Sequence, residues 1–295
     1  MNRLKNFSYF EPASVKEAVE TLTAEEGAFP LAGGTDLLVR MKRGEVHPTA
    51  LVNLKHIRNL KKIKTENGNG ITIGALASIS DIQGSSVIQA KHPLLVQAAG
   101  VVGSPSIRNL ATIGGNIGRA SPASDMSPSL MILHARIVTA GPKGKREVSM
   151  NEIFAGPGTT TLANAEFITA FYIPEPSPRT GTAYLKLGRR AGGGDCALVG
   201  VATLLTVEND EAKAVGIALS SVGPTPMRAL KAEAVVMAGP LDDERIKEAA
   251  RAAADEVNPI TDLRCSASYR KEMVKVLTYR ALIESLQKAK GGMPV

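Results

Sequence analysis

Near the start of the chain, apolar residues first follow a helical spacing and then form short runs typical of buried strands. This pattern predicts a small lobe that contains one helix and two strands. A helical pattern follows the capping box Ser14-x-x-Glu17. An apolar run at residues 29–32 predicts a buried strand, and residues 51–54 predict a second short strand. Residues 1–56 are therefore expected to form a βαβ-like lobe.

A hairpin pattern opens a second predicted lobe. Asn67-Gly68-Asn69-Gly70 separates two stretches of strand character, which is typical of a two-stranded hairpin. Helical spacing follows at residues 79–87 and 93–102, and Ser127-Pro128 predicts the N-cap and first turn of another helix. Further strands are expected at residues 136–140, 145–148 and 166–173, and the lobe is expected to span residues 57–176.

A proline-rich stretch marks the expected domain boundary. Pro174, Pro176 and Pro178 are followed by Gly181, a composition that favours an irregular connection. Beyond it, strands are predicted at residues 182–189, 198–207 and 214–221, and helices at residues 243–257 and 267–287. The order of elements indicates an α+β fold, with a second domain at residues 181–290.

The composition narrows the functional classes. The chain has 295 residues, of which 44% are hydrophobic and 21% charged, as expected of a globular protein with room for two domains. No apolar run approaches the roughly 20 residues of a membrane helix, and the N-terminus shows no secretory signal. The net charge is +7, but the basic residues are scattered among 28 acidic ones, and aromatics make up only 4%. Platforms for stacking bases are therefore scarce, so we expect an anionic cofactor and no nucleic acid.

The cysteines and histidines do not predict a metal site. Cys196 and Cys265 are the two cysteines, and neither has a partner at C-x-x-C spacing. This excludes structural zinc and an iron–sulfur cluster held by this chain alone, which needs about four thiolates. The four histidines are isolated along the sequence. Free thiols without a secretory signal favour a cytoplasmic location.

Two glycine segments carry the candidate chemistry. The first glycine segment, residues 31–38, reads L-A-G-G-T-D-L-L, and the second, residues 111–125, reads A-T-I-G-G-N-I-G-R-A-S-P-A-S-D. Two Gly-Gly turns, each entered from an apolar run, suit a diphosphate held from two sides by backbone N–H groups. Neither segment fits G-x-G-x-x-G or the phosphate loop, so the pattern predicts nucleotide binding by a different fold. Taken singly, each Gly-Gly is typical of an ordinary turn.

These segments and three other stretches together resemble the FAD-binding medium subunit of molybdenum hydroxylases, the group that holds xanthine dehydrogenase and carbon monoxide dehydrogenase. The resemblance covers nearly the whole chain. It rests on F-x-Y-F-x-P at residues 7–12, G-S-P-S-I-R-N-L-A-T-I-G-G-N at 103–116, Y-L-K-L-G-R-R…D-C-A-L-V at 184–199 and Y-R-K-E-M-V-K-V-L at 269–277. The stretch at residues 107–116 is the most specific of them.

The resemblance implies both a fold and a function. The fold would be a two-lobed FAD-binding domain of the p-cresol methylhydroxylase type, followed by a smaller α+β domain with a three-stranded antiparallel sheet plus helices. The chain would carry non-covalent FAD as an oxidoreductase subunit. Electrons would arrive from the [2Fe–2S] clusters of a small subunit and leave to NAD⁺ or another acceptor. Hydroxylation would occur on a large subunit with the molybdenum cofactor, in a dimer of heterotrimers.

Two alternatives remain open at this stage. A self-contained FAD oxidase would bind its own substrate, and its C-terminal region would then supply acid–base groups to a substrate cavity. That region contains no histidine, and its only aromatics are Tyr184, Tyr269 and Tyr279, which argues against such a cavity. A nucleotide-binding module without catalysis is the other alternative, and a redox-active flavin would exclude it.

The resemblance also implies roles for particular residues. It places around the cofactor Ala32, Gly33, Gly34, Thr35 and Asp36 of the first glycine segment, Thr112, Ile113, Gly114, Gly115 and Asn116 of the second, and Ser121, Asp125, Ile168 and Lys186. Asp36 is expected to cap local N–H groups. Asp125 is expected either to accept from ribose hydroxyls or, with Ser124, to cap the following helix. Lys186 is expected beside the flavin ring, where an ammonium would stabilise the anionic reduced form.

The chain departs from the family pattern at two places. Arg119 stands where a smaller residue is expected, and it would either contact phosphate or point to solvent. Three glycines, residues 192–194, precede Asp195, which leaves the role of this acid open; pairing with Arg189 or Arg190 is the simplest one.

Overall fold

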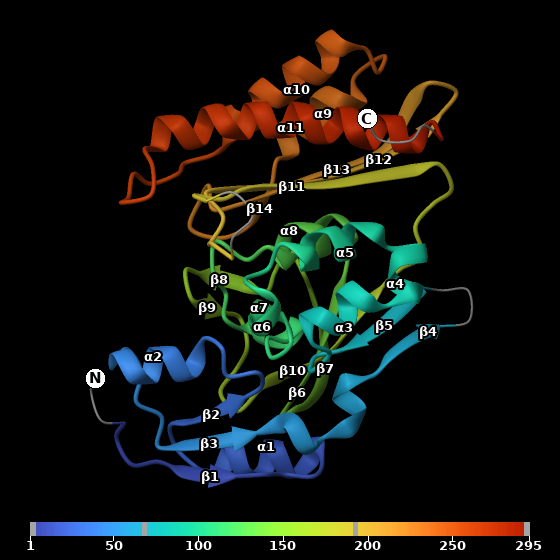
Figure 1. Ribbon diagram of the computed structural model, residues 1–295. Helices are drawn as coiled ribbons and strands as arrows, with labels where there is room; N and C mark the ends of the chain where they lie inside the picture. The colour runs from blue at the N-terminus through green and yellow to red at the C-terminus, as the bar shows by residue number, and fades with distance from the viewer. Residues whose placement is uncertain (1–3, 67–69, 191–193, 292–295) are drawn as a thin grey trace.

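The computed structural model describes residues 4–66, 70–190 and 194–291, and it stacks three units along one direction (Figure 1). The N-terminal lobe lies at the bottom of this view, a middle lobe above it and the C-terminal domain at the top. The predicted turn at residues 67–69 lies outside the described residues. Among the helices of the described ranges, none combines the length and the apolar character that a membrane crossing requires.

The N-terminal lobe is a parallel sheet with helices on its connections. Its elements are β1 (Ser8–Phe10), α1 (Val15–Ala24), β2 (Ala28–Leu31), α2 (Leu37–Arg43) and β3 (Ala50–Asn53), with strand order β1-β3-β2. Ser14 caps α1 as predicted, because its hydroxyl accepts from the backbone N–H of Glu17 at 3.1 Å. Helix α2 was not predicted; it ends at Gly44, whose φ of 74° is left-handed.

The middle lobe is an antiparallel sheet covered by short helices. Its sheet has the order β4-β5-β10-β6-β7. The elements are η1 (Leu54–His56), η2 (Arg58–Lys61), β4 (Ile63–Glu66), β5 (Gly70–Gly74), α3 (Ile79–Gly84), α4 (Ser86–Lys91), α5 (Pro93–Gly100), α6 (Pro105–Arg108), α7 (Ile113–Gly118), α8 (Met126–Ile132), β6 (Arg136–Gly141), β7 (Gly144–Ser149), β8 (Phe154–Gly156), β9 (Thr159–Thr160) and β10 (Phe167–Ile173).

Two helix starts differ from the sequence predictions. The expected single helix over residues 79–87 is broken at Ser85, whose hydroxyl accepts from the N–H of Ile88 and caps α4. Helix α8 begins at Met126, two residues before Pro128, so the predicted N-cap at Ser127 is wrong. The Ser124 hydroxyl accepts from the N–H of Ser127 at 3.2 Å and does the capping instead.

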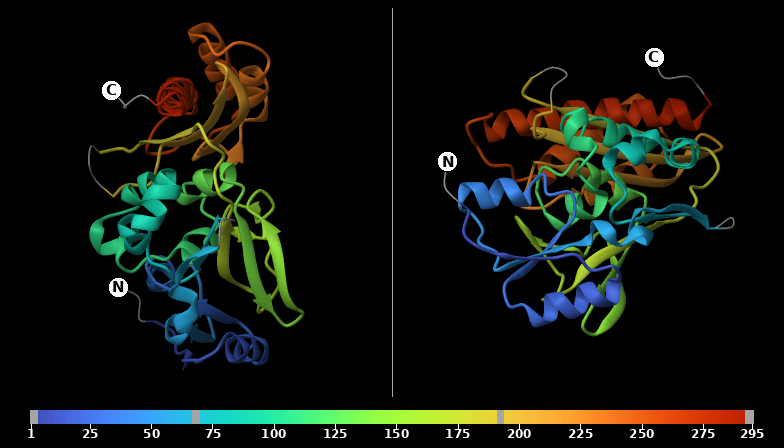
Figure 2. Two further views of the ribbon diagram at one scale, coloured as in Figure 1. Left: turned by 90° about the vertical axis from the view of Figure 1, so that its right-hand side faces the viewer. Right: turned by 60° about the horizontal axis from the view of Figure 1, so that its bottom comes forward.

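The C-terminal domain is an antiparallel sheet between two layers of helix. It contains β11 (Thr180–Leu187), β12 (Val199–Glu208), β13 (Glu211–Ser220), β14 (Met227–Arg228), α9 (Leu230–Met237), α10 (Asp243–Glu256) and α11 (Ala267–Ala289). The predicted three strands are joined by the short fourth strand β14. Helix α11 crosses the outer face of the sheet, and α5 and α8 of the middle lobe lie against its inner face (Figures 1 and 2).

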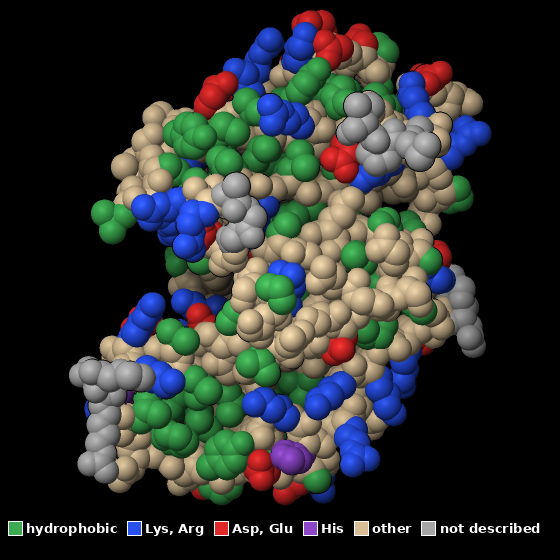
Figure 3. All heavy atoms as spheres, viewed as in Figure 1, with side chains coloured by type: hydrophobic (Ala, Val, Ile, Leu, Met, Phe, Trp, Pro, Cys, Tyr) green, Lys and Arg blue, Asp and Glu red, His purple; other side chains and the backbone are tan. Residues whose placement is uncertain are grey.

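The inner face of this sheet shares its core with the middle lobe. Tyr184, Ala202 and Ala218 of the sheet belong to the same buried cluster as the helices and strands below. The side-chain oxygen of Gln97, on α5, accepts from the backbone N–H of Tyr184 at 3.0 Å. Figure 3, which has the same orientation as Figure 1, shows that the surface on the left is hollowed between α2 and the C-terminal domain.

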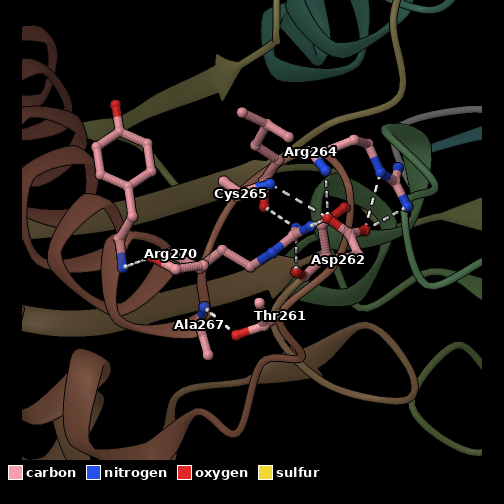
Figure 4. A network of polar contacts seen from close by, with 10 residues as sticks. Thr261, Asp262, Arg264, Cys265, Ala267 and Arg270 are labelled. Carbon is pink, nitrogen blue, oxygen red and sulfur yellow. Dashed lines mark hydrogen bonds and ion pairs between the residues drawn. The ribbon is translucent and has the colours of Figure 1, made fainter.

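A carboxylate in the loop before α11 fastens that helix to the sheet (Figure 4). Asp262 Oδ1 accepts from the backbone N–H of Arg264 at 2.9 Å and from Arg270 Nη2 at 3.0 Å. Arg270 is almost fully buried and also donates to the carbonyls of Leu198 and Ser221, at 2.6 and 3.1 Å. These contacts hold the first turn of α11 where β12 begins and β13 ends.

We expect Asp262→Asn to lower the free energy of unfolding by about 2 kcal/mol near neutral pH. Burial acts to raise the pKa of Asp262, but backbone hydrogen bonds from Arg264 and Cys265 and the charge of Arg270 outweigh it and hold this pKa at about 2. The ordinary value is 3.8, and each unit of difference corresponds to about 1.4 kcal/mol. Since the folded state has the lower pKa, the stabilisation is complete above about pH 4 and is lost as the pH falls toward 2. Urea unfolding of both proteins between pH 7 and pH 3 checks this; a difference that does not shrink with acid contradicts it.

Candidate functional site

A cavity of about 550 Å³ lies where the N-terminal and middle lobes meet, and residues 194–196 of the C-terminal domain close one side. This volume lies within the usual range for small-molecule and cofactor sites. Of the fourteen residues predicted around a cofactor, twelve line it: Ala32, Gly33, Gly34, Thr35, Asp36, Thr112, Gly114, Gly115, Asn116, Ser121, Asp125 and Ile168. Ile113 and Lys186 do not belong to the lining.

The first glycine segment presents free backbone donors to the cavity. It joins β2 to α2, and Gly34 has a φ of 76°, which L side chains rarely adopt. Gly33 lies directly against the middle lobe, since a Cβ there would be 2.0 Å from the Leu110 carbonyl oxygen. Within the described residues, the backbone N–H groups of residues 33–36 donate no hydrogen bond. Adjacent unpaired N–H groups in a cavity wall can bind an anion.

The second glycine segment differs from the expected turn because it forms helix α7, capped by the Thr112 hydroxyl. Its N–H groups are already used: Ile113 donates to Ala77, Gly114 to Ala75, and both Gly115 and Asn116 to Thr112, at 2.9 to 3.1 Å. The backbone N–H groups of residues 113–116 are therefore already bonded within the protein.

Two side chains of α7 lie in different surroundings: Asn116 lines the cavity, and Ile113 belongs to the core. The Asn116 Oδ1 atom accepts from the Ser124 hydroxyl at 2.6 Å, while its amide N–H groups donate no hydrogen bond within the described residues. This leaves a side-chain donor at the cavity wall. Ile113 points the other way and is fully buried. Gly114 packs on the residue that follows β5, because a Cβ there would lie 2.7 Å from both the Cβ and the carbonyl oxygen of Ala75.

Asp125 and Lys186 form a buried ion pair at the inner wall. Lys186 Nζ lies 2.8 Å from Asp125 Oδ2, and the two side chains are 9% and 8% exposed. Lys186 also donates to the Val101 carbonyl at 2.9 Å, and the Tyr184 hydroxyl donates to Asp125 Oδ1 at 3.0 Å. Lys186 is not among the lining residues, but it is bonded to Asp125, which is; its expected place beside the flavin ring stays a prediction. Asp125 stands at the N-cap position of α8 but makes no capping bond.

Burial dominates the electrostatics of this pair. It raises the pKa of Asp125, although the Lys186 charge and hydrogen bond act in the opposite direction. It also raises the pKa of the Tyr184 hydroxyl well above its ordinary value, and the Asp125 charge adds to that effect. Tyr184 therefore stays protonated and donates to the carboxylate.

Ile168, Ser121 and Asp195 have the following places and contacts. Ile168 lies on β10 beside an irregularity in its pairing with β6, and its nearly buried side chain forms part of the wall. The Ser121 hydroxyl accepts from the N–H of Ala123 at 3.3 Å. Asp195 pairs with Arg190, Oδ1 to Nη2 at 2.5 Å, as the simplest expectation had it. Residues 192–193 lie outside the described residues.

Asp36 does not cap α2, which corrects the expectation for this residue. Its Oδ2 atom instead lies 2.8 Å from Arg119 Nε, so the two residues form an ion pair between the lobes. Glu166 also lines the cavity and was missed, since nothing in its local sequence marks it. Burial acts to raise the pKa of Glu166, but hydrogen bonds from Arg146, Thr139 and the Ala163 backbone hold it at about 2, so the residue is ionised.

In the described part of the chain, no group of three or more His, Cys, Asp and Glu side chains is placed to hold a metal ion. The lining contains one cysteine, Cys196, and no histidine. The cavity offers an anion site on the first glycine segment, an apolar wall on β10 and a buried ion pair. This arrangement suits an elongated ligand with an anionic group and a ring.

The similarity to known proteins extends over nearly the whole chain. The FAD binding domain in molybdopterin dehydrogenase matches residues 5–176, and the CO dehydrogenase flavoprotein C-terminal domain matches residues 183–285. The glyceraldehyde dehydrogenase medium chain of Sulfolobus acidocaldarius is 35% identical, over 94% of this chain and 98% of its own length. The carbon monoxide dehydrogenase medium chain of Afipia carboxidovorans is 34% identical, over 97% and 98%. A solved carbon monoxide dehydrogenase chain from Hydrogenophaga pseudoflava superposes with a TM-score of 0.92 at 34% identity, over 96% of this chain and 98% of that one.

Proposed function

Because the chain belongs to the family of FAD-binding medium subunits of molybdenum hydroxylases, we propose that it binds FAD in the cavity between its lobes and passes electrons within a larger oxidoreductase. The observation that carries this proposal is the free backbone N–H groups of residues 33–36 at the wall of a cavity of about 550 Å³. They fit the diphosphate, and the apolar wall at Ile168 fits a flat ring.

The chain's own residues bind and orient the cofactor. The chemistry that FAD supplies is the transfer of one or two electrons. Residues 33–36 and the Asn116 amide would donate hydrogen bonds to its polar parts, and Ile168 would pack against the ring. Lys186 acts through Asp125, whose carboxylate it holds at the cavity wall by the 2.8 Å ion pair. Tyr184 fixes the second oxygen of that carboxylate.

We propose that the electrons come from a partner and not from a substrate bound here. Among the described residues of the C-terminal domain, residues 194–196 alone line the cavity, which favours the proposed electron-transfer subunit over a self-contained oxidase. A small subunit with [2Fe–2S] clusters would donate the electrons, and NAD⁺ or another acceptor would remove them. A large subunit would carry the molybdenum cofactor, in a dimer of heterotrimers. The two free thiols, Cys196 and Cys265, favour assembly in the cytoplasm.

The purified chain is expected to release FAD when it is denatured. The lining contains no histidine, and Cys196 lies in the exposed segment at the rim, so the proposed contacts are all non-covalent. Acid precipitation followed by an absorbance spectrum should find about one FAD per chain in the supernatant. Cys196→Ala is the matched control, and it should release the same amount. Flavin that stays in the wild-type pellet would contradict the non-covalent site, and a chain without flavin would contradict the proposed function.

A further inference from the structure

Two arginines from different lobes converge on one carboxylate in the cavity. Arg40 is on α2 of the N-terminal lobe, and Arg119 follows the last turn of α7 in the middle lobe. Arg119 Nε lies 2.8 Å and Arg40 Nη1 4.0 Å from the same oxygen, Asp36 Oδ2. All three residues line the cavity. We refer to Arg40 and Arg119 together as the arginine pair.

The guanidinium groups of the arginine pair have unused donors. Within the described residues neither side chain makes a hydrogen bond of acceptable geometry, and the Nε atom of each is buried without a hydrogen-bond partner. Both groups are held by charge alone: Arg119 by Asp36, and Arg40 by Asp36 and by Glu45 at 3.6 Å. An arginine carries five N–H donors in a planar fork that matches phosphate oxygens. Unused donors of this kind at a cavity wall point to an anionic ligand.

The backbone around Arg119 leaves room for its guanidinium. The loop between β8 and β9 passes beside it, and a Cβ on Gly158 would lie 3.0 Å from Arg119 Nη1. The same loop is fixed by a hydrogen bond of 2.8 Å from the N–H of Gly158 to the carbonyl of Ala120. Arg119 is therefore placed by α7, by the β8–β9 loop and by Asp36 across the cavity.

The other charged residues of the lining are already neutralised. Asp125 is paired with Lys186, Glu166 with Arg146, and Asp195 with Arg190. Arg40, Arg43 and Arg119 together carry three positive charges against the two negative charges of Asp36 and Glu45, and the free N–H groups of residues 33–36 begin at the same place. The excess positive charge of the cavity is therefore concentrated beside the first glycine segment.

We propose that the arginine pair binds the diphosphate of the cofactor, and that Asp36 is a counter-ion that competes with the diphosphate for the two guanidinium groups. This inference rests on the proposed binding of FAD. The sequence left open whether Arg119 contacts phosphate or points to solvent. The inference assigns it to the phosphate. It also gives the diphosphate side-chain donors in place of the backbone donors that α7 does not offer.

The first test compares ligands with and without a diphosphate. FAD and riboflavin are titrated into the flavin-free chain, and binding is followed by flavin fluorescence. Arg119→Gln and Arg40→Gln should each raise the Kd of FAD at least about tenfold, as expected for a lost charged hydrogen bond, and leave the Kd of riboflavin unchanged. Arg58→Gln, on an exposed residue of η2, is the matched control. An Arg119→Gln variant that binds FAD like the wild type would overturn the inference.

The second test distinguishes an arginine pair that binds the diphosphate from an ion pair that only holds the two lobes together. Asp36→Asn removes a negative charge beside the diphosphate, so it should lower the Kd of FAD, opposite to the effect of Arg119→Gln. If the ion pair only joined the lobes, both variants would weaken FAD binding, and that result would overturn the inference. Thermal unfolding of the flavin-free variants checks that each is folded.

Two further measurements distinguish a failure of the proposed function from a failure of the inference about the arginine pair. A wild-type chain that fails to bind FAD would reject the proposed function itself, before any variant is compared. NADH binding to the FAD-loaded chain is measured as well, since NADH also contains a diphosphate. If the arginine variants lost NADH binding but kept normal FAD binding, the pair would serve another dinucleotide, and the inference would fall.

Discussion

Lys186→Met is expected to destabilise the folded chain by about 3–5 kcal/mol, the usual cost of removing one partner from a buried ion pair. The substitution keeps most of the apolar stem but removes the ammonium that lies 2.8 Å from Asp125 Oδ2. The carboxylate, only 8% exposed, would be left with the Tyr184 hydroxyl as its remaining side-chain donor. Urea unfolding at pH 7, followed by circular dichroism, measures the loss.

A double variant distinguishes this explanation from a simple packing defect. Asp125→Asn combined with Lys186→Met removes both charges, so it should recover most of the stability lost in the single variant. Recovery would show that the cost arises from an uncompensated buried carboxylate. A double variant as unstable as Lys186→Met, or a single variant within about 1 kcal/mol of the wild type, would show that the pair does not contribute as described.

Gly33→Ala is expected to abolish the retention of FAD. The added Cβ would be placed 2.0 Å from the carbonyl oxygen of Leu110 and 2.8 Å from its carbon, and these are backbone atoms that cannot rotate away. The N-terminal lobe would have to shift from the middle lobe, which would move the free N–H groups of residues 33–36 and widen the cavity. Forced overpacking of this kind also costs about 1–3 kcal/mol of stability. The ratio of flavin to protein absorbance after gel filtration measures retention.

Gly84→Ala provides the matched control for that experiment. Gly84 ends α3, away from the residues that line the cavity, and a Cβ there would meet no atom within 4 Å. Its flavin content should therefore stay close to that of the wild type. If Gly33→Ala retained as much flavin as Gly84→Ala, the contact with Leu110 would not be what closes the cavity.

The sequence predicted the long periodic elements well and the short glycine-rich ones poorly. The helix after Ser14 and the three long C-terminal strands follow patterns that burial imposes directly. Helix α7 was predicted as a turn because its three glycines have low helix propensity. It forms because Thr112 caps it and because Ile113 and Ile117, four residues apart, are both fully buried. Tertiary packing thus overrides the local preference.

The contacts within the candidate site were also difficult to predict from the sequence, but for a different reason. The glycine segments could be recognised because each is a continuous stretch of sequence. The partners of their side chains come from elsewhere in the chain: Arg119 for Asp36, and Lys186 for Asp125. The pairing of distant segments is set by sheet register and by the way the lobes meet, which a single sequence does not specify. For this reason Asp36 was assigned to a cap, and neither of these ion pairs was predicted.

The shared core beneath the C-terminal sheet limits how this chain can be divided or recombined. The proline-rich connection at residues 174–178 suggests an exchangeable module, but Tyr184, Ala202 and Ala218 beyond it are buried among the residues of the middle lobe. A fragment cut at this connection would expose one apolar face on each half. A chimera that takes its second half from a relative would join two faces that were never selected to fit each other. We therefore expect substitutions on α5, α8 and the inner sheet face to be coupled in their effect on stability, so that the two halves behave as one folding unit.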